Sequence, residues 1–249
     1  TLLPSLMREK SNLLATKKNR GKSGYDLIGV SNPHVFTKKL GNIINRIKND
    51  TKLRKTLNLT GHFDDEKIEG MLQHYGLRTR YIDAVDNHWV ALWMALHEYK
   101  YPELKSRYNY AYYSRRVIPT LDFLEKLAKG EPYEINNLYL YIIMIAVPKK
   151  GAKEEEGVSE TTDFYEIDLR KSLPSTFIRP HAQHGIVIRK KPKQLQKAAD
   201  YDIASQVVGI IKVRIDRAAE WLGDGSLLSQ TALFPPSAYD DGYRILIER

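Results

Sequence analysis

The sequence predicts an α+β fold, in which an N-terminal helical part with a buried central helix packs on a mostly antiparallel C-terminal sheet. Apolar residues recur at helical spacing in the first half, and β-branched and aromatic runs dominate from Asn137 onward. With 249 residues and 42% hydrophobic content, the chain can fill one large core. We expect a single domain over 1–249, with a basic helical part (1–60), a helical core (61–135) and a sheet-rich part (136–249).

The N-terminal quarter is predicted to be helical, with a short helix around Leu3–Leu14 and a longer one over Val35–Asn49. The longer helix has one apolar stripe, formed by Phe36, Leu40, Ile43, Ile44 and Ile47.

The positive charge of the chain is concentrated in this quarter. The formal net charge is +9, and within residues 1–60 lysine and arginine outnumber acidic residues 13 to 3. Such a surface favours a polyanion, and the candidate nucleic-acid contacts are Lys17, Lys18, Arg20 and Lys22. The alternative is a solvated lysine face that aids solubility.

Two helices are expected in the centre of the chain. Asp64–His74 has apolar residues at helical spacing and is followed by Gly76, which suits the position after the C-cap. Asp86–Leu96 is apolar on nearly every side, and Asp86 or Asn87 can cap it, so we expect a buried core helix.

The remaining elements follow from composition and turn signals. We expect Leu104–Lys129 to be largely helical with a division at Pro119, and Lys149–Thr162 to be a charged loop. Leu138–Val147 reads as a central strand covered on both faces. A helix over Arg217–Leu222 should end at Gly223. Further strands are predicted at Phe164–Leu169, Gly185–Arg189, Val207–Ile215 and Tyr243–Ile247.

The loop between the two central helices is rich in polar side chains. Within fifteen residues it and its margins hold His74, Tyr75, Arg78, Arg80, Asp83, Asp86 and His88. Loops held between rigid elements often bind or catalyse. The alternative is that Arg80 and Asp83 pair with each other or satisfy helix ends, and that His74 is a core histidine.

Three segments carry a resemblance to a known family. Gln73-His74-Tyr75-Gly76-Leu77, then Thr79-Arg80, Asp83 and Val90-Ala91-Leu92 resemble the central signature of the FRG domain. Leu2–Leu6 resembles the segment after its Phe-Arg-Gly triplet, and Arg179–Gly185 resembles its later Arg, Gln, Gly motif. The chain departs from the pattern at Arg78, where Pro is usual, and at Ala84-Val85, where Trp-Thr is usual. The triplet itself is expected to precede Thr1.

The chemistry of these residues suits a dinucleotide. Arginines Arg80 and Arg179 can pair with a pyrophosphate, Tyr75 can stack on a ring, and His74 can hydrogen-bond a ribose hydroxyl. The predicted catalytic residues are His74, Tyr75, Arg80 and Asp83. The predicted cofactor-binding residues are Arg78, Arg179, Gln183 and His184.

The resemblance implies a bacterial or phage conflict protein, so we expect an ADP-ribosyltransferase-like effector or toxin that uses NAD and modifies nucleic acid or protein. An antitoxin or other regulatory partner is expected in that setting. Such transferases usually need a carboxylate to orient the attacking group, and Glu220 and Glu248 stand in no recognisable motif.

Two other functions stay open. One is a non-catalytic nucleic-acid or partner-binding module. The other is a metal-dependent nuclease using Asp64, Asp65, Asp83 and Asp86, although these residues more readily cap helices. No metal site is predicted, because His181 and His184 have no third nearby histidine and no HExxH motif occurs.

Other classes find no support in the sequence. It contains no nucleophile elbow, phosphate loop or dinucleotide-binding glycine motif. It has no cysteine and no apolar run long enough to span a bilayer, so we expect a cytoplasmic protein with no membrane partner. The substrate, the oligomeric state and what precedes Thr1 are left open.

Overall fold

The computed structural model describes residues 33–77, 79–100, 112–116, 124, 126, 128–130, 138–192, 201–236 and 238–247. The chain divides into two compact units, each discontinuous in sequence. The first unit comprises residues 1–86, 146–206 and 235–249, and the second comprises 87–145 and 207–234. Helices and antiparallel strands occur in both, so the predicted α+β class is confirmed. That the whole chain forms one FRG-like domain stays a prediction.

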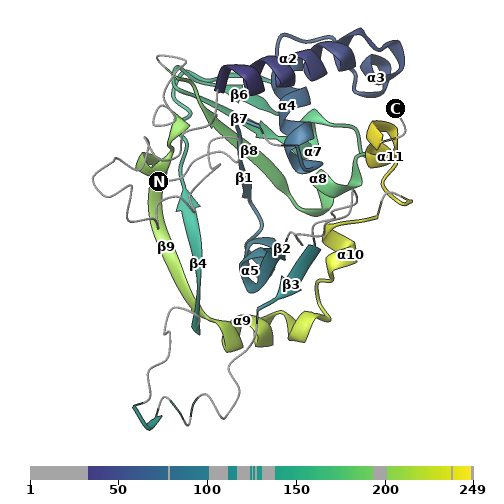
Figure 1. The fold of residues 1–249 in the computed structure, drawn as a ribbon. Coiled ribbons are helices and arrows are strands. Elements are labelled where there is room, and N and C mark those ends of the chain that lie inside the picture. The colour runs from purple at the N-terminus through teal and green to yellow at the C-terminus, as the bar shows by residue number, and fades with distance from the viewer. Residues whose placement is uncertain are drawn as a thin grey trace. The chain divides into compact units, whose positions relative to one another are not determined.

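The first unit is built on a five-stranded sheet in the order β1-β8-β7-β6-β5, with every neighbouring pair antiparallel (Figure 1). Its strands are β1 (Ile82–Val85), β5 (Lys153–Glu155), β6 (Val158–Glu160), β7 (Phe164–Asp168) and β8 (Gly185–Lys190). At one edge Asp83 of β1 lies opposite Val187 of β8, and Val85 lies opposite Gly185. This register brings the signature loop beside the Arg179–Gly185 segment, about 100 residues later in the chain.

Helix α4 (Asp64–His74) lies against this sheet. Its Ile68 and Met71 are fully buried with Ile167 and Val187 of the sheet. Gly70 allows the close approach, because a Cβ at this position would lie 2.9 Å from Cγ2 of Val187. The other helices that the structure describes in this unit are α2 (Pro33–Asn49), α3 (Thr51–Thr56), α7 (Leu169–Ser172), α8 (Ile178–Ala182) and α11 (Asp241–Ile247), with a 3₁₀ turn at Ala204–Gln206.

The predicted stripe of α2 is confirmed in part. Leu40, Ile44 and Ile47 are buried in the core of the first unit, and Ile43 packs against it. The side chain of Phe36 lies outside the described residues, as do the predicted helix at Leu3–Leu14 and the basic residues Lys17, Lys18, Arg20 and Lys22.

The second unit contains α5 (His88–Leu96), whose first turn is capped as predicted. The Asn87 side chain accepts hydrogen bonds from the backbone N–H groups of Trp89 and Val90. Trp93 is buried and its ring stacks on His97, with centroids 3.8 Å apart. The unit also holds α9 (Ile215–Trp221), a 3₁₀ turn at Gly223–Gly225 and α10 (Gln230–Leu233). The described part of the unit also holds two ribbons: β2 (His97–Lys100) with β3 (Tyr112–Arg115), and β4 (Tyr139–Ile145) with β9 (Val207–Arg214).

Several sequence-based expectations were wrong. Tyr243–Ile247 belongs to helix α11 and not to a strand, and Asp240 accepts a hydrogen bond from the N–H of Tyr243 in its first turn. Tyr112–Arg115 is a strand inside the segment predicted to be helical. The charged loop Lys149–Thr162 contains the β5–β6 hairpin, which turns through Glu156 and Gly157, both at positive φ.

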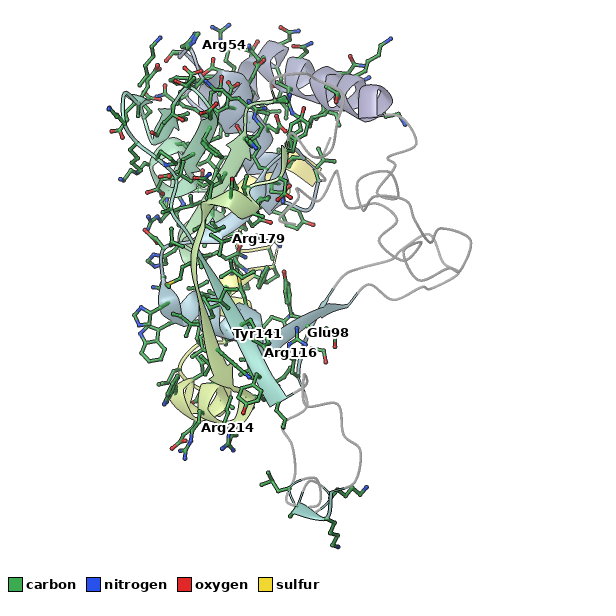
Figure 2. All side chains as sticks on the ribbon, turned by 90° about the vertical axis from the view of Figure 1, so that its left-hand side faces the viewer. Arg54, Glu98, Arg116, Tyr141, Arg179 and Arg214 are labelled. Carbon is green, nitrogen blue, oxygen red and sulfur yellow. The ribbon has the colours of Figure 1, made fainter. Side chains whose placement is uncertain are left out.

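The expectation that strand Leu138–Val147 would be covered on both faces was also wrong. In the part of the chain that the structure describes, β4 pairs with β9 alone, and Tyr141, Ile143 and Met144 are exposed (Figure 2). The apolar run predicted the strand correctly and its surroundings incorrectly, because periodicity does not distinguish a buried strand from an exposed ribbon. The predicted central helix α5 packs on strand β4 of the second unit, and helix α4 packs on the five-stranded sheet of the first.

Candidate functional site

The signature begins at the C-terminal end of α4, which a Schellman motif closes. Tyr75 is the C-cap, and Gly76 follows with φ +91°, a conformation that glycine adopts without strain. The N–H of Gly76 donates to the carbonyl of Gln73 (3.0 Å), and that of Leu77 donates to the carbonyl of Leu72 (2.9 Å). This ending, which the sequence predicted, directs the chain toward β1.

Gln73 connects the helix, the loop and β1. Its carbonyl oxygen Oε1 accepts a hydrogen bond from Oγ1 of the buried Thr79 (2.7 Å). Its Nε2 donates to Oδ2 of Asp83 (2.9 Å). The same Thr79 Oγ1 accepts from the N–H of Tyr81 (3.1 Å). Gln73 therefore fixes the loop and the orientation of the Asp83 carboxylate together.

His74 lies next to the Asp83 carboxylate, on its buried side. Its side chain is 4% exposed, and its Nε2 is 3.6 Å from Oδ1 of Asp83. Neither ring nitrogen has a hydrogen-bond partner of normal geometry in the described part of the chain. Gly185 makes room for the ring, since a Cβ there would lie 2.8 Å from Nε2 and closer still to Cε1.

The imidazole is held in its neutral form. Burial lowers the pKa of His74, and the charge of Arg179 acts in the same direction. The Asp83 carboxylate and the Gln183 amide oppose this shift without reversing it. The Asp83 side chain, by contrast, is 56% exposed. The arrangement is a surface carboxylate, oriented by an amide, with a buried neutral imidazole behind it.

Arg80 is occupied elsewhere. Its guanidinium forms a bidentate ion pair with Glu69 of α4, and its backbone N–H donates to the same carboxylate (2.9 Å). The alternative of an Arg80–Asp83 pair was therefore wrong. Glu69 also receives Nη1 of the buried Arg189 (3.2 Å), whose Nη2 reaches Glu66 (3.3 Å). We call these four side chains the arginine network, and it favours a structural role for Arg80.

Tyr75 is similarly engaged. Its hydroxyl donates to the fully buried Asp240 (2.8 Å to Oδ2), and its ring stacks on Tyr243 with centroids 5.3 Å apart. Phe177 meets the ring edge-on. Burial and the bond to Asp240 raise the pKa of Tyr75, so the phenol stays protonated. The tyrosine ring predicted to stack on a ligand stacks instead on the C-terminal helix α11.

Arg179 and Gln183 also lie close to His74. Arg179, labelled in Figure 2, donates from Nη1 to the carbonyl of His74 (3.1 Å), and its guanidinium lies over the rings of Tyr75 and Tyr243. Gln183 is buried and forms the C-cap of α8. Both predicted residues therefore reach the His74 region, where Arg179 supports the end of α4.

His184 belongs to a neighbouring cluster. It adopts φ +51°, and its Nδ1 lies 2.9 Å from Nη1 of Arg170 and 3.2 Å from Oδ1 of Asp86. Arg170 also binds Asp86 (2.5 Å) and Asp168 (2.9 Å). Sequence reasoning missed Arg170 and Asp168. Asp168 caps α7, and this local capping pattern does not predict that Asp168 lies near His184.

The remaining predicted residues stand apart from these contacts. Arg78 and Glu248 lie outside the described residues, and Glu220 pairs with Arg217 in the second unit. The four aspartates of the nuclease alternative have separate partners: Asp64 accepts from Gly61, Asp65 from Lys48, Asp83 from Gln73 and Asp86 from Arg170. The described ranges contain no group of three or more His, Cys, Asp or Glu that could hold a metal.

The chain matches no protein-family model, no curated protein and no solved structure. The FRG resemblance therefore rests on the signature residues alone. Among the helices that the structure describes, none is long and apolar enough to cross a membrane.

Proposed function

We propose that this protein is a nucleotide-binding FRG-domain effector or toxin with ADP-ribosyltransferase-like activity, using NAD as its substrate in bacterial or phage conflict. The observation that supports this most directly is the His74–Asp83 pair. It includes the exposed Asp83 carboxylate, which Gln73 orients and which this chemistry needs, and Asp83 was already among the residues predicted to be catalytic.

The main catalytic group that the proposed reaction requires is such a carboxylate. When the bond between ribose C1′ and the nicotinamide nitrogen breaks, the electron pair leaves with nicotinamide, and positive charge develops on the ribose as in glycoside cleavage. Asp83 would stabilise that charge and accept the proton of the attacking hydroxyl or amine. His74, being neutral, would not oppose the developing charge, and Gln73 would keep the Asp83 carboxylate oriented.

The other predicted site residues then have different roles. Three of them support the His74–Asp83 pair from the surrounding structure: Arg80 pairs with Glu69, Tyr75 donates to Asp240, and Arg179 donates to the carbonyl of His74. Arg78 keeps its predicted role in cofactor binding, on the grounds of the sequence. Gln183 and His184 keep a proposed role beside the substrate, since they immediately precede Gly185, which contacts the His74 ring.

The test compares two aspartates of equal exposure. The full-length protein is incubated with labelled NAD, nucleic acid and cell protein, and nicotinamide release and label transfer are measured. Asp83→Asn should lower both rates about 100-fold or more. Asp65→Asn is the matched control, since Asp65 is 54% exposed and pairs with Lys48 on the surface. Equal rates for both variants, or no transfer by the wild type, would exclude the proposal.

One observation favours a second candidate, a non-catalytic nucleic-acid or partner-binding module. Arg80 and Tyr75, two side chains proposed to contact a dinucleotide, are committed to contacts within the protein. In that case the basic N-terminal quarter would supply the affinity. Oligonucleotide binding that weakens steeply with added salt, without consumption of NAD, would distinguish this function.

A further inference from the structure

The β4–β9 ribbon of the second unit has two unlike faces. Its register places Tyr139 opposite Arg214, Tyr141 opposite Lys212 and Ile143 opposite Ile210. Directly opposed residues share a face, and alternate residues along a strand do too, so these six side chains form one face and Val208 extends it. We call these seven residues the ribbon face. Leu140, Ile142, Val213 and Ile211 lie on the opposite face.

The opposite face is packed at Leu140 and Val213 but exposed at Met144 (42%) and Ile211 (45%), whereas the ribbon face is exposed at Tyr141, Ile143, Val208 and Ile210. Leu140 and Val213 are buried, and α5 and α9 contact β4 and β9. On the ribbon face, Ile143 is 43% exposed, Ile210 60% and Val208 66%. Tyr141 and Arg214 are labelled on this ribbon in Figure 2. A contiguous group of exposed β-branched side chains is typical of a protein-binding surface.

The backbone of the ribbon is also incompletely paired. Among the described residues, β9 hydrogen-bonds with β4 and with no other strand. A two-stranded ribbon is of marginal stability by itself, and an edge strand is a template for pairing with another chain. A third strand along β9 would satisfy backbone groups and cover Val208 and Ile210 together.

The charges of the face indicate what that strand carries. Neither β4 nor β9 contains an acidic residue. Arg214 is neutralised by Asp216 (2.6 Å), whereas Lys212 lies over the Tyr139 ring, 3.8 Å from its centroid. A cation in that position favours a carboxylate at one end of the incoming strand.

Other occupants fit less well. A second copy would bring its own Lys212 and a net charge of +9, so the two chains would repel. A nucleic-acid strand would use Tyr141 for stacking, yet Ile143, Val208 and Ile210 offer no aromatic ring to a base.

We propose that the ribbon face is a docking surface for another protein, which adds an extended segment along β9 with alternating apolar side chains and an acidic residue against Lys212.

A direct binding measurement tests this. The probe is a fluorescent peptide of eight residues, the length of β9, with isoleucine and threonine alternating and glutamate at one end. Full-length protein should bind it, and Ile210→Asp should weaken binding about tenfold or more. Ile211→Thr is the control, since Ile211 is 45% exposed on the opposite face, and it should bind as the wild type does.

A charge swap keeps the test independent of folding. Lys212→Glu should weaken binding of the glutamate peptide, and a peptide with lysine in that position should restore it. The proposal is overturned if the peptide does not bind, or if the Ile210 and Ile211 variants behave alike. It is equally overturned if single-stranded RNA binds in place of the peptide, or if the chain forms a dimer that Ile210→Asp abolishes.

Discussion

Two groups of polar residues share helix α4 and its signature loop, and they differ in how completely they are paired. In the arginine network, Glu69 and Arg189 are buried and matched by opposite charges. At the His74–Asp83 pair, the imidazole is buried and, among the described residues, has no charged partner closer than the Asp83 carboxylate at 3.6 Å, and that carboxylate is exposed. Paired buried charges leave no uncompensated charge in the core, whereas a buried ionisable group beside an accessible carboxylate is typical of functional sites. The difference separates the framework of the signature from its reactive part.

The largest effect should come from Glu69→Gln. Removing this carboxylate charge leaves Arg80 and the buried Arg189 without their main partner, and breaking a buried pair in this way costs about 3–5 kcal/mol. Urea denaturation measures the free energy of unfolding. Glu66→Gln is the control, because Glu66 makes one longer contact to Arg189 (3.3 Å) and its effect should be smaller. Equal losses would contradict the central role of Glu69.

Tyr75→Phe tests whether the role of Tyr75 is structural. The substitution removes a donor from the buried Asp240 carboxylate, and a hydrogen bond to a charged group contributes about 1.5–3 kcal/mol. Tyr165→Phe is the comparison, since its hydroxyl binds Glu160 near the surface (2.8 Å). Thermal denaturation should rank Tyr75→Phe as the more harmful change, and the reverse order would remove Tyr75 from the framework.

Gly185→Ala tests the close contact between Gly185 and the His74 ring. The added methyl group overlaps the imidazole ring, and overpacking of this kind costs about 1–3 kcal/mol. Combining it with His74→Ala should relieve the clash, so the double variant should be more stable than the sum of the single changes predicts. Strict additivity would mean that the two residues do not touch.

The pH dependence of stability should report on His74 itself. The unfolded imidazole takes up a proton near pH 6.5, whereas the folded one does so at lower pH, so folding weakens as pH falls below 6.5. One proton accounts for a slope of at most about 1.4 kcal/mol per pH unit. His74→Asn should flatten this part of the profile. An unchanged profile would show that His74 is not held neutral.

Asp83→Asn should have the smallest effect on stability, below about 0.5 kcal/mol, because the side chain is exposed and an amide can still bind Gln73. The loss of transferase activity proposed above would then occur in a fully folded protein. A large loss of stability would instead place Asp83 within the framework.

The sequence predicted those features that depend on neighbouring residues. Helix α4 was predicted with its observed bounds, because Ile68, Met71 and Leu72 have helical spacing and Gly76 ends the helix. The Asn87 cap of α5 followed from the same local reasoning.

The features that were missed depend on distant residues. Glu69 has no special local pattern, and its partner Arg189 is 120 residues away. Strand β1 is four residues long and is fixed by pairing with β8, which no local signal specifies. In Tyr243–Ile247 the apolar residues suit both a strand and a helix, and in the structure they form a helix whose Tyr243 stacks on Tyr75.

The bond between Tyr75 and Asp240 joins residues separated by 165 positions. During synthesis on the ribosome, the end of α4 therefore lacks its support until Asp240 and Tyr243 have left the exit tunnel. Nascent chains that stop before this point contain every residue of the signature but not the aromatic and acidic contacts that hold Tyr75 and Arg179. The order of translation thus delays completion of the site until residues 235–249, which also belong to the first unit, have been made and have left the tunnel.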